Sequence, residues 1–348
     1  MKTIKIGKNK FTREGPFYFI AELGQNHQGE LDIAMKMIEV AANCGVHAVK
    51  LQKRDNKSLF TKAQYEKDYD NENSFGKTYG EHREALEFGK KEYKVLKEFA
   101  EDKGVDFLCT AWDEPSADFL ERLGMPAYKI ASSDITHIPL LTHVAKFGKP
   151  MIVSTGACNL DEVKRAYEAI IKYNDQIILL HCTAGYPTDY PDLNLRAIET
   201  LKREFPEAIV GYSGHDNGVL APIIAHMLGA VVFEKHFTLN RSMRGGDHKF
   251  SLEPEGLRKQ IRDLERISQS LGDGIKELRE FEIEPRNKMG KSLYAAKPLK
   301  KGTVLKKSDI AIKVPAGKLP PYELENVLGK KLKVNLPHEA PIQFEHLK

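Results

Sequence analysis

The sequence of 348 residues predicts a (β/α)₈ barrel followed by a small β-rich domain. Short apolar runs alternate eight times with amphipathic segments over about 255 residues, which is the repeat number and length of such a barrel. This alternation implies parallel strands joined by right-handed crossovers. A polar residue ends each run, as expected at a barrel rim. A doubly wound open sheet is the alternative, but no run is followed by G-x-G-x-x-G.

Each of the eight predicted strands is short and begins apolar, as in a sheet that is covered on both faces. In chain order they are FYFIAELG (17–24), HAVKLQK (47–53), DFLCTAW (106–112), AYKIAS (127–132), PMIVSTG (150–156), QIILLHC (176–182), AIVGYSG (208–214) and VVFEKHF (231–237). The segments between them, such as LDIAMKMIEVAANCG (31–45), carry apolar residues at helical spacing and end near Gly or Lys.

Three segments lie outside this repeat. TIKIGKNKF (3–11) alternates around a Gly-Lys-Asn turn and predicts a hairpin that plugs the lower end of the barrel. The insertion 54–89 is long enough for a lid or binding loop, with disorder as the alternative, and its role stays open. Residues 286–348 contain short strands and Lys-Gly turns without paired helices. We therefore expect a barrel domain at 1–280 and a β-rich domain at 286–348, joined near Glu284–Pro285.

The composition excludes several classes of protein. Charged residues make up 29% and the net charge is +4 without a basic block, so nucleic acid is not an expected partner. No apolar run reaches membrane-spanning length, and MKTIKIGKNKF lacks the apolar core of a signal peptide, so we expect a cytoplasmic protein without a membrane partner. The four cysteines show no C-x-x-C spacing, which argues against a zinc finger or a disulfide framework.

The polar residues at the strand ends are the candidates for function. They are Glu22, Lys50, Gln52, Thr110, Lys129, Ser132, Ser154, His181, Thr183, Ser213, His215, Glu234 and His236. One polar strand end would mean little, because strand ends are commonly solvated. Eight strand ends that converge on one rim predict an active site there.

His215 and His236 end consecutive strands and are candidate metal ligands. Neighbouring parallel strands lie about 4.8 Å apart, and two inward imidazoles at that separation can share one metal. The alternative is a pair of hydrogen-bonded histidines at strand ends. Two ligands do not make a closed structural site, so the sequence favours an open site that water or substrate completes.

Lys50 and Lys129, together with nearby hydroxyl groups, form a candidate anion site. The hydroxyls are those of Thr110, Ser132, Ser154 and Ser213. Two cations with several hydroxyl donors suit a phosphate or a carboxylate. Two alternatives stay open: the hydroxyls only cap the following helices, or one lysine forms a Schiff base with a carbonyl substrate.

The carboxylates near the rim are candidate acid–base groups. Glu22 and Glu234 lie on the first and last strands, and Glu234, close to His236, is alternatively a carboxylate beside the metal. Asp247 lies in RGGDHKFSLEP after the last strand and can bind a sugar hydroxyl. Its alternative interpretation is a turn residue next to Gly-Gly.

Several motifs occur together in an order that resembles sialic acid synthases. They are IAELGQNHQG, VKLQ, AYKIASSDITHIPLL, PMIVSTG, GYSGH, EKHFTL and GGDHKFSLEP. The tail, SLYAAKPLKKGTVLKKSDI…LGKKL, is similar to the antifreeze-like (SAF) domain of that family. The resemblance covers nearly the whole chain. It implies an N-acetylneuraminate synthase, which condenses phosphoenolpyruvate with the open-chain aldehyde of N-acetylmannosamine and releases phosphate.

The resemblance also implies roles for individual residues. His215 and His236 would hold a divalent metal, typically Mn²⁺, with Mg²⁺ or Co²⁺ as alternatives. The positions that match the phosphoenolpyruvate site are Lys50, Thr110, Lys129, Ser132, Ser154 and Ser213. Those that match the surroundings of the acceptor sugar and the reacting centre are Glu22, Gln52, Tyr186 and Asp247. Asp134 stands where relatives carry Glu or Asp, and with Glu22, Lys129 and Glu234 it completes the expected catalytic set. The family's tail domain covers the partner's barrel mouth, which implies a domain-swapped homodimer.

Some positions depart from the family pattern and leave the acceptor open. CTAWD lacks the Pro-Phe that many relatives carry after the Thr, Ala184 replaces a polar residue, and Val314 stands where K-R-P-G relatives have an arginine. The first alternative is a synthase of legionaminic or pseudaminic acid. A Schiff-base aldolase that uses Lys129 or Lys50 is a second alternative. The third is a sugar- or ice-binding protein without activity.

Overall fold

The computed structural model describes residues 3–348 and divides the chain into two compact units. The first unit ends at Leu271 and the second runs from Gly272 to Lys348. Glu284 and Pro285, where the composition predicts the junction, lie inside helix α12 (Glu280–Met289) of the second unit.

Eight parallel strands of the first unit close into a barrel, as the alternation predicts. They are β3 (Tyr18–Gly24), β4 (Ala48–Lys53), β5 (Asp106–Ala111), β6 (Tyr128–Ile130), β7 (Met151–Ser154), β8 (Ile177–Cys182), β9 (Ile209–Gly214) and β10 (Val232–His236). Each strand pairs with its neighbour in the chain, and β10 closes the barrel by pairing with β3. The predicted fold class is therefore confirmed.

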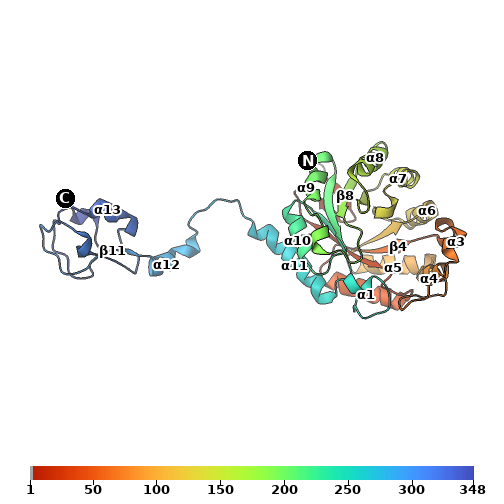
Figure 1. Ribbon diagram of the computed structural model, residues 1–348, viewed down its shortest axis with the longest axis horizontal. Coiled ribbons are helices and arrows are strands. Elements are labelled where there is room, and N and C mark those ends of the chain that lie inside the picture. The colour runs from red at the N-terminus through yellow and green to blue at the C-terminus, as the bar shows by residue number, and fades with distance from the viewer. Residues whose placement is uncertain (1–2) are drawn as a thin grey trace. The chain divides into compact units, whose positions relative to one another are not determined.

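Helices follow the strands and surround the barrel (Figure 1). They are α1 (Leu31–Asn43), α5 (Lys90–Asp102), α6 (Glu114–Leu123), α7 (Ile138–Ala145), α8 (Leu160–Ile171), α9 (Ala197–Glu204), α10 (Leu220–Met227) and α11 (Pro254–Ser270). Local sequence sets their ends. Helix α8 begins with a capping box between Asn159 and Glu162, and α6 ends at Gly124, whose φ of 77° suits a glycine.

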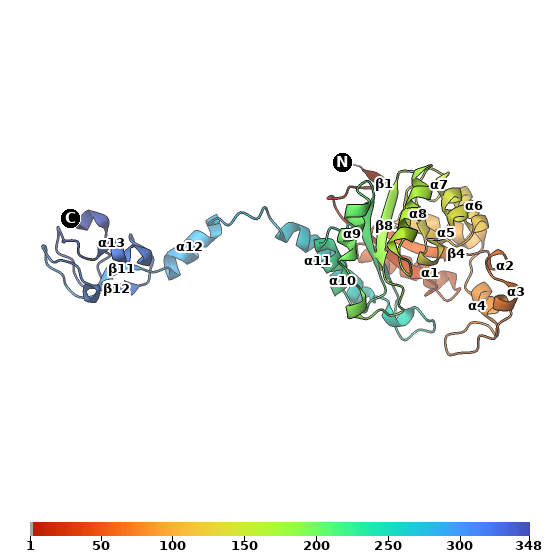
Figure 2. The ribbon, with the colours of Figure 1, turned by 45° about the horizontal axis from the view of Figure 1, so that its top comes forward.

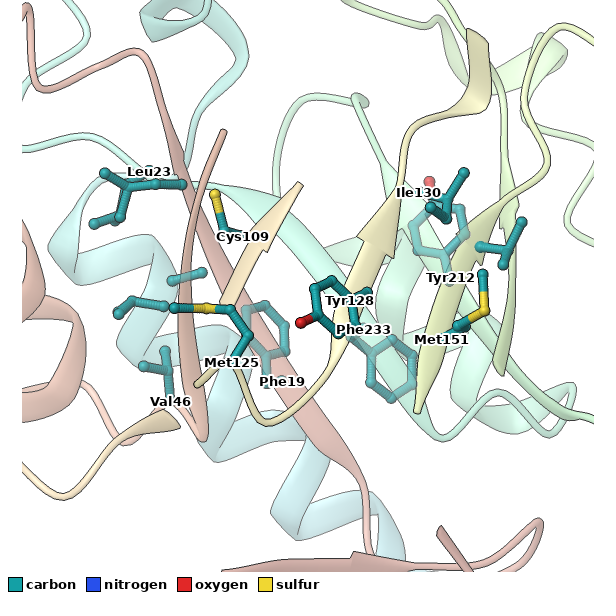
Figure 3. Close-up of a cluster of buried hydrophobic side chains, with 14 of the residues drawn as sticks. Phe19, Leu23, Val46, Cys109, Met125, Tyr128, Ile130, Met151, Tyr212 and Phe233 are labelled. Carbon is teal, nitrogen blue, oxygen red and sulfur yellow. The ribbon is translucent and has the colours of Figure 1, made fainter. Parts of the chain in front are cut away.

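The main hydrophobic core lies between the strands and the helices. Phe19, Tyr128 and Phe233 are fully buried in it and come from three different strands (Figure 3). Side chains on a strand point alternately to the two faces, so these residues face the helices while their neighbours face the barrel interior. Burial of apolar area on this scale is the main force that holds the barrel together.

The predicted hairpin closes the lower end of the barrel. Strands β1 (Ile4–Ile6) and β2 (Asn9–Phe11) pair antiparallel, and Ile4, Ile6 and Phe11 pack in one cluster with residues that begin the barrel strands. Gly7 is at the turn with φ +53°, and a Cβ there would lie 1.7 Å from Asp106 Oδ1, so only glycine fits.

The insertion 54–89 contains three short helices, and the rest of it is mainly turns and loops. These are α2 (Asn56–Leu59), α3 (Lys62–Tyr65) and α4 (Tyr79–Ala85), which gather at one edge of the barrel (Figure 2). Thr78 and Glu81 form a capping box that starts α4. We call the insertion the lid segment.

The second unit has a small core of its own. Strands β11 (Ser292–Ala295) and β12 (Ile310–Lys313) pair antiparallel, four isolated bridges extend the pairing, and α13 (Leu324–Val327) is a single turn. Leu293, Val327 and Ile342 are fully buried at its centre. None of the helices in residues 3–348 is long and apolar enough to span a membrane.

Candidate active site

A cavity of about 300 Å³ opens where the strand ends converge. Its lining contains twelve of the fourteen side chains to which the family resemblance assigns a role. These are Glu22, Lys50, Gln52, Thr110, Lys129, Ser132, Ser154, Tyr186, Ser213, His215, Glu234 and His236. Asp134 and Asp247 are not in the lining. We call this space the main cavity.

Strand register brings these side chains together. Glu22 of β3 is level with Lys50 of β4 on one side and with His236 of β10 on the other. In the same way Thr110 of β5 is level with Lys129 of β6. Parallel neighbours in register lie about 4.8 Å apart, so side chains on the inner face must meet above the barrel core.

A buried charge network lies at the floor of the main cavity. Lys50 Nζ lies 2.5 Å from Glu22 Oε2 and 3.5 Å from Glu234 Oε1, and it donates to Thr110 Oγ1 at 2.8 Å. Burial raises the pKa of Glu22 to about 7, with Lys50 opposing the rise and Glu234 adding to it. Burial alone would lower the pKa of Lys50, but the two carboxylates outweigh it and the pKa is raised.

Lys129 is less tightly bound by its neighbours. Its Nζ donates to Ile130 O at 3.2 Å and lies 3.8 Å from Glu234 Oε1. Burial lowers the pKa of Lys129, and Glu234 only partly restores it. An ammonium group has three donors, so Lys129 can still bind an anion in the cavity. The buried hydroxyl of Ser154, which has no partner among the described residues, suits the same role.

The two histidines face each other across the rim, with ring centroids 5.5 Å apart. Burial lowers the pKa of His215 to about 4 and that of His236 to about 3, so both rings are neutral near pH 7. His215 Nδ1 donates to Thr183 O at 3.2 Å, which leaves the lone pair on Nε2. His236 Nδ1 is buried without a hydrogen-bond partner in the described chain.

These features fit a metal held by two imidazoles. A nitrogen that binds a metal must be unprotonated. A buried nitrogen without a hydrogen-bond partner is available to bind one. Within residues 3–348, no group of three His, Cys, Asp or Glu side chains comes together as a metal site. The remaining ligands would therefore be water or substrate, as in an open site.

Asp247 lies at the edge of the main cavity, although it is not part of the lining. Its Oδ2 is 3.7 Å from His236 Nδ1. A Cβ on Gly24 would meet Glu22 Oε1 at 3.3 Å, Asp247 Oδ2 at 3.4 Å and Gln52 Nε2 at 3.5 Å. Glycine at this position therefore leaves a small open space where three polar side chains converge.

Asp134 lies apart from the cavity lining, in the 3₁₀ turn Ser132–Asp134. Its side chain is buried, and burial raises its pKa to about 6, with Arg54 opposing the rise. Its Oδ2 has no hydrogen-bond partner in the described chain. Asp134 is therefore the member of the expected catalytic set that does not line the main cavity.

Several lining residues were not predicted. They are Trp112, Ala131, Ser133, Ala157 and Cys182. Ala184, which the sequence marks as a departure from the family pattern, also lines the cavity. Trp112 is the single tryptophan of the chain and ends a predicted strand. This position could have identified it as a site residue from the sequence. Arg54 stacks over its ring at 4.2 Å and donates to Gln52 Oε1. His181, although at a strand end, is not in the lining and hydrogen-bonds Leu193 O at 2.8 Å.

Comparison with known proteins identifies the family. Residues 37–276 match the model of the NeuB family, and residues 290–348 match that of the SAF domain. The chain belongs to the NeuB family. The resemblance drawn from the sequence motifs is therefore confirmed.

NeuB relatives and solved structures match the chain over most of its length. The N-acetylneuraminate-9-phosphate synthase of Homo sapiens is 38% identical, over 95% of this chain and 92% of its own. The N,N'-diacetyllegionaminic acid synthase of Legionella pneumophila is 37% identical, over 95% and 94%. A crystal structure of the sialic acid synthetase of Leptospira borgpetersenii in complex with citrate has a TM-score of 0.71 at 35% identity, covering 82% of this chain and 95% of that one.

Proposed function

We propose that this protein is an N-acetylneuraminate synthase that condenses phosphoenolpyruvate with the open-chain aldehyde of N-acetylmannosamine and releases phosphate. The observation that carries the proposal is the main cavity of this NeuB-family chain. There two buried lysines and two neutral histidines line the same cavity of about 300 Å³. The lysine side of the cavity suits an anion, and the histidine side suits a carbonyl group that a metal polarises.

The lysine half would hold phosphoenolpyruvate. Lys50 and Lys129 supply positive charge, and the hydroxyls of Ser132, Ser154 and Ser213 supply further donors around the same space. Charged hydrogen bonds to phosphate and carboxylate are the strong ones in proteins. The two glutamates already balance the charge of the two lysines. The bound anion would therefore replace the internal contacts of Lys129 instead of entering a site with excess positive charge.

His215 and His236 would hold a divalent cation, with Mn²⁺ as the first candidate and Mg²⁺ or Co²⁺ as alternatives. When bound, such a cation supplies Lewis-acid polarisation of the acceptor's carbonyl oxygen. The chain's own contribution is to keep both imidazoles neutral by burial and to fix the His215 tautomer through Thr183 O.

Glu22 would move the protons of the reaction. A bond forms between C3 of phosphoenolpyruvate and the aldehyde carbon, water adds at C2, and the bond from C2 to the phosphate oxygen breaks. The new hydroxyl gains one proton, and the water loses one as it adds to C2. The hydroxyl left on C2 gives its remaining proton to the departing phosphate as the keto group forms. A single carboxyl group with a pKa near 7 can give the first proton and take the second. No covalent nucleophile is needed, and positioning carries most of the catalysis.

The acceptor sugar would lie against Gln52, Tyr186 and Asp247 near the histidines. Tyr186 is 58% exposed, and its ring centroid lies 4.1 Å from that of His215. Curated relatives include legionaminic and pseudaminic acid synthases, and others whose named product is a 9-phosphate. Related acceptors of these kinds are therefore the competing substrates for this chain.

The experiment that tests the proposal is an acceptor panel with phosphoenolpyruvate, following phosphate release and identifying the product by mass. We expect the mass of N-acetylneuraminate from N-acetylmannosamine. Phosphoenolpyruvate with ¹⁸O in the bridging position should deliver the label to phosphate. Label that stays in the sugar product would overturn the carbon–oxygen cleavage. A borohydride-stable adduct on Lys129 would favour the aldolase instead.

The metal proposal has a separate test. We expect purified, chelator-treated protein to bind one Mn²⁺ per chain with a rise in Tm, and the His215→Ala and His236→Ala variants to lose both the binding and the rise. His143→Ala is the matched control, because this half-buried histidine pairs with Asp118 away from the cavity. Mn²⁺ binding that survives in His236→Ala would show that the ligands lie elsewhere.

A further inference from the structure

We infer that a buried ion pair behind the main cavity, Lys235 with Asp216, positions the two histidines that would hold the metal. This inference rests on the proposed function, because it adds positioning residues to the proposed metal site. Lys235 directly precedes His236 in the chain, and Asp216 directly follows His215. Neither member of the pair lines the main cavity. The pair would therefore act on the metal only through the two histidines.

His215 lies beyond the end of its strand, so the sheet alone does not fix its position. Strand β9 ends at Gly214, which is level with Lys235 of β10 and is the last residue of β9 in register with that strand. His236, in contrast, is still part of β10 and is level with Glu22 of β3. The barrel therefore fixes the backbone of His236, whereas that of His215 needs contacts outside the strand ladder.

The ion pair lies on the side of the strands that faces the helices. Side chains alternate between the two faces of a strand, and Lys235 lies between Glu234 and His236, which both line the main cavity. The side chains of Lys235 and Asp216 are both 0% exposed, with Nζ 2.9 Å from Oδ1. A buried ion pair adds little stability compared with apolar residues of the same volume. Its presence here therefore favours a role in fixing geometry.

Lys235 holds the main chain of Asp216 as well as its side chain. Its Nζ donates to Asp216 O at 2.5 Å and to Asp216 Oδ1 at 2.9 Å. Tyr212 Oη, which comes from the buried core between strands and helices (Figure 3), donates to the same carboxylate oxygen at 2.7 Å. These three hydrogen bonds tie the segment after His215 to both β9 and β10. They take the place of ladder bonds beyond the end of β9.

Gly214 makes room for this contact. A Cβ on Gly214 would lie 2.4 Å from Tyr212 Cε1 and 2.5 Å from Asp216 Oδ1, so a larger residue would push these two side chains apart. On the other side of the segment, Thr188 N donates to His215 O at 3.2 Å. His215 is therefore held between the β8–α9 loop and the network of Tyr212, Asp216 and Lys235.

A metal site with two ligands from the chain depends strongly on the separation of those ligands. The ring centroids of His215 and His236 lie 5.5 Å apart. Bond lengths in a metal site vary by only about 0.2 Å, so a small shift of one backbone weakens binding. Without Lys235, the segment after His215 would lose two of its three hydrogen bonds to the strands. We therefore expect the ion pair to control the affinity for the metal.

The test measures the Kd for Mn²⁺ by isothermal titration calorimetry on the full-length protein without substrates. Lys235→Met keeps much of the side-chain length and removes the cation. We expect its Kd to rise by about 10–100-fold, as for other groups that support a metal ligand. Native affinity in folded Lys235→Met would overturn the inference and leave the proposed metal site intact. Native protein that binds no Mn²⁺, or that binds it equally as His236→Ala, would overturn the metal site and this inference with it.

A milder pair of variants decides the question even if Lys235→Met, which leaves Asp216 buried and unpaired, does not fold. Tyr212→Phe removes one hydrogen bond to Asp216. Tyr18→Phe is the matched control: this tyrosine, also 1% exposed, donates to Asp106 at 2.8 Å near the opposite end of the barrel. We expect both variants to lower Tm, but only Tyr212→Phe to raise the Kd for Mn²⁺, by about threefold or more. Equal Kd values in the two variants would show that the network only stabilises the fold.

Discussion

At the scale of single residues, the site depends on side chains whose charge is set by burial. Glu22 and Lys50 are each at most 2% exposed and touch at 2.5 Å, so neither can gain much solvation by water. Removing one partner of such a pair leaves the other charge buried and unpaired, which is strongly destabilising. Substitutions at Glu22 should therefore keep its shape and its hydrogen bonds.

Glu22→Gln keeps the shape and removes the titration. Burial raises the pKa of Glu22 to about 7, and the proposed reaction begins with its protonated form. We expect kcat/KM for the acceptor, at saturating phosphoenolpyruvate, to fall as pH rises through about 7 in the native enzyme. In Glu22→Gln this limb should disappear and kcat should fall by about 10²–10⁴. If kcat/KM of the variant falls over the same pH range, a group other than Glu22 is responsible for the pH dependence.

Strand residues of the site were predictable because a strand fixes the side to which each residue points. Glu234 and His236, two apart, had to share a face, and both line the main cavity. Asp134 sits in a 3₁₀ turn, where the sequence sets no such alternation, and it does not line the cavity. Arg54 begins the lid segment and reaches the site by stacking on Trp112, a contact between loops that no periodicity indicates.

At the scale of elements, the barrel and the hairpin were predictable, whereas the helices of the lid segment were not. The alternation of apolar residues in a strand and their 3.6-residue period in a helix become recognisable only over several residues. Helices α2 and α3 have four residues each, too few for a helical period. Their local caps, Asp55 for α2 and Thr61 for α3, are the only short-range signal of where they begin.

The hairpin should contribute to stability without taking part in the chemistry. Ile6 is fully buried against the first residues of the barrel strands, at the end opposite the main cavity. Ile6→Ala should lower the free energy of unfolding by about 2–5 kcal/mol and leave kcat/KM within about threefold at 25 °C. Denaturant unfolding and steady-state kinetics measure the two effects. Lys5→Ala, an exposed position of the same strand, is the control and should change neither. Lost activity at unchanged stability would contradict this division.

At the scale of the whole molecule, the chain consists of two units with separate hydrophobic cores. In the second unit Val314 is 50% exposed, and the neighbouring Lys313 is paired with Glu339 at 2.5 Å. Lys318, four residues after Val314, has no ion pair within the described residues and is therefore the freer of the two cations.

We propose a domain-swapped homodimer, in which the second unit of one chain completes the barrel of the other. Complementation tests this proposal. One chain ends at Leu271, where the first unit ends, and therefore keeps an intact main cavity. The other is full-length His236→Ala, with an intact second unit and a disabled metal site. Each alone should be inactive, and the mixture should regain turnover, because the truncated barrel receives the second unit of its partner. If each second unit instead served its own barrel, the mixture would stay inactive while both proteins remained folded by circular dichroism.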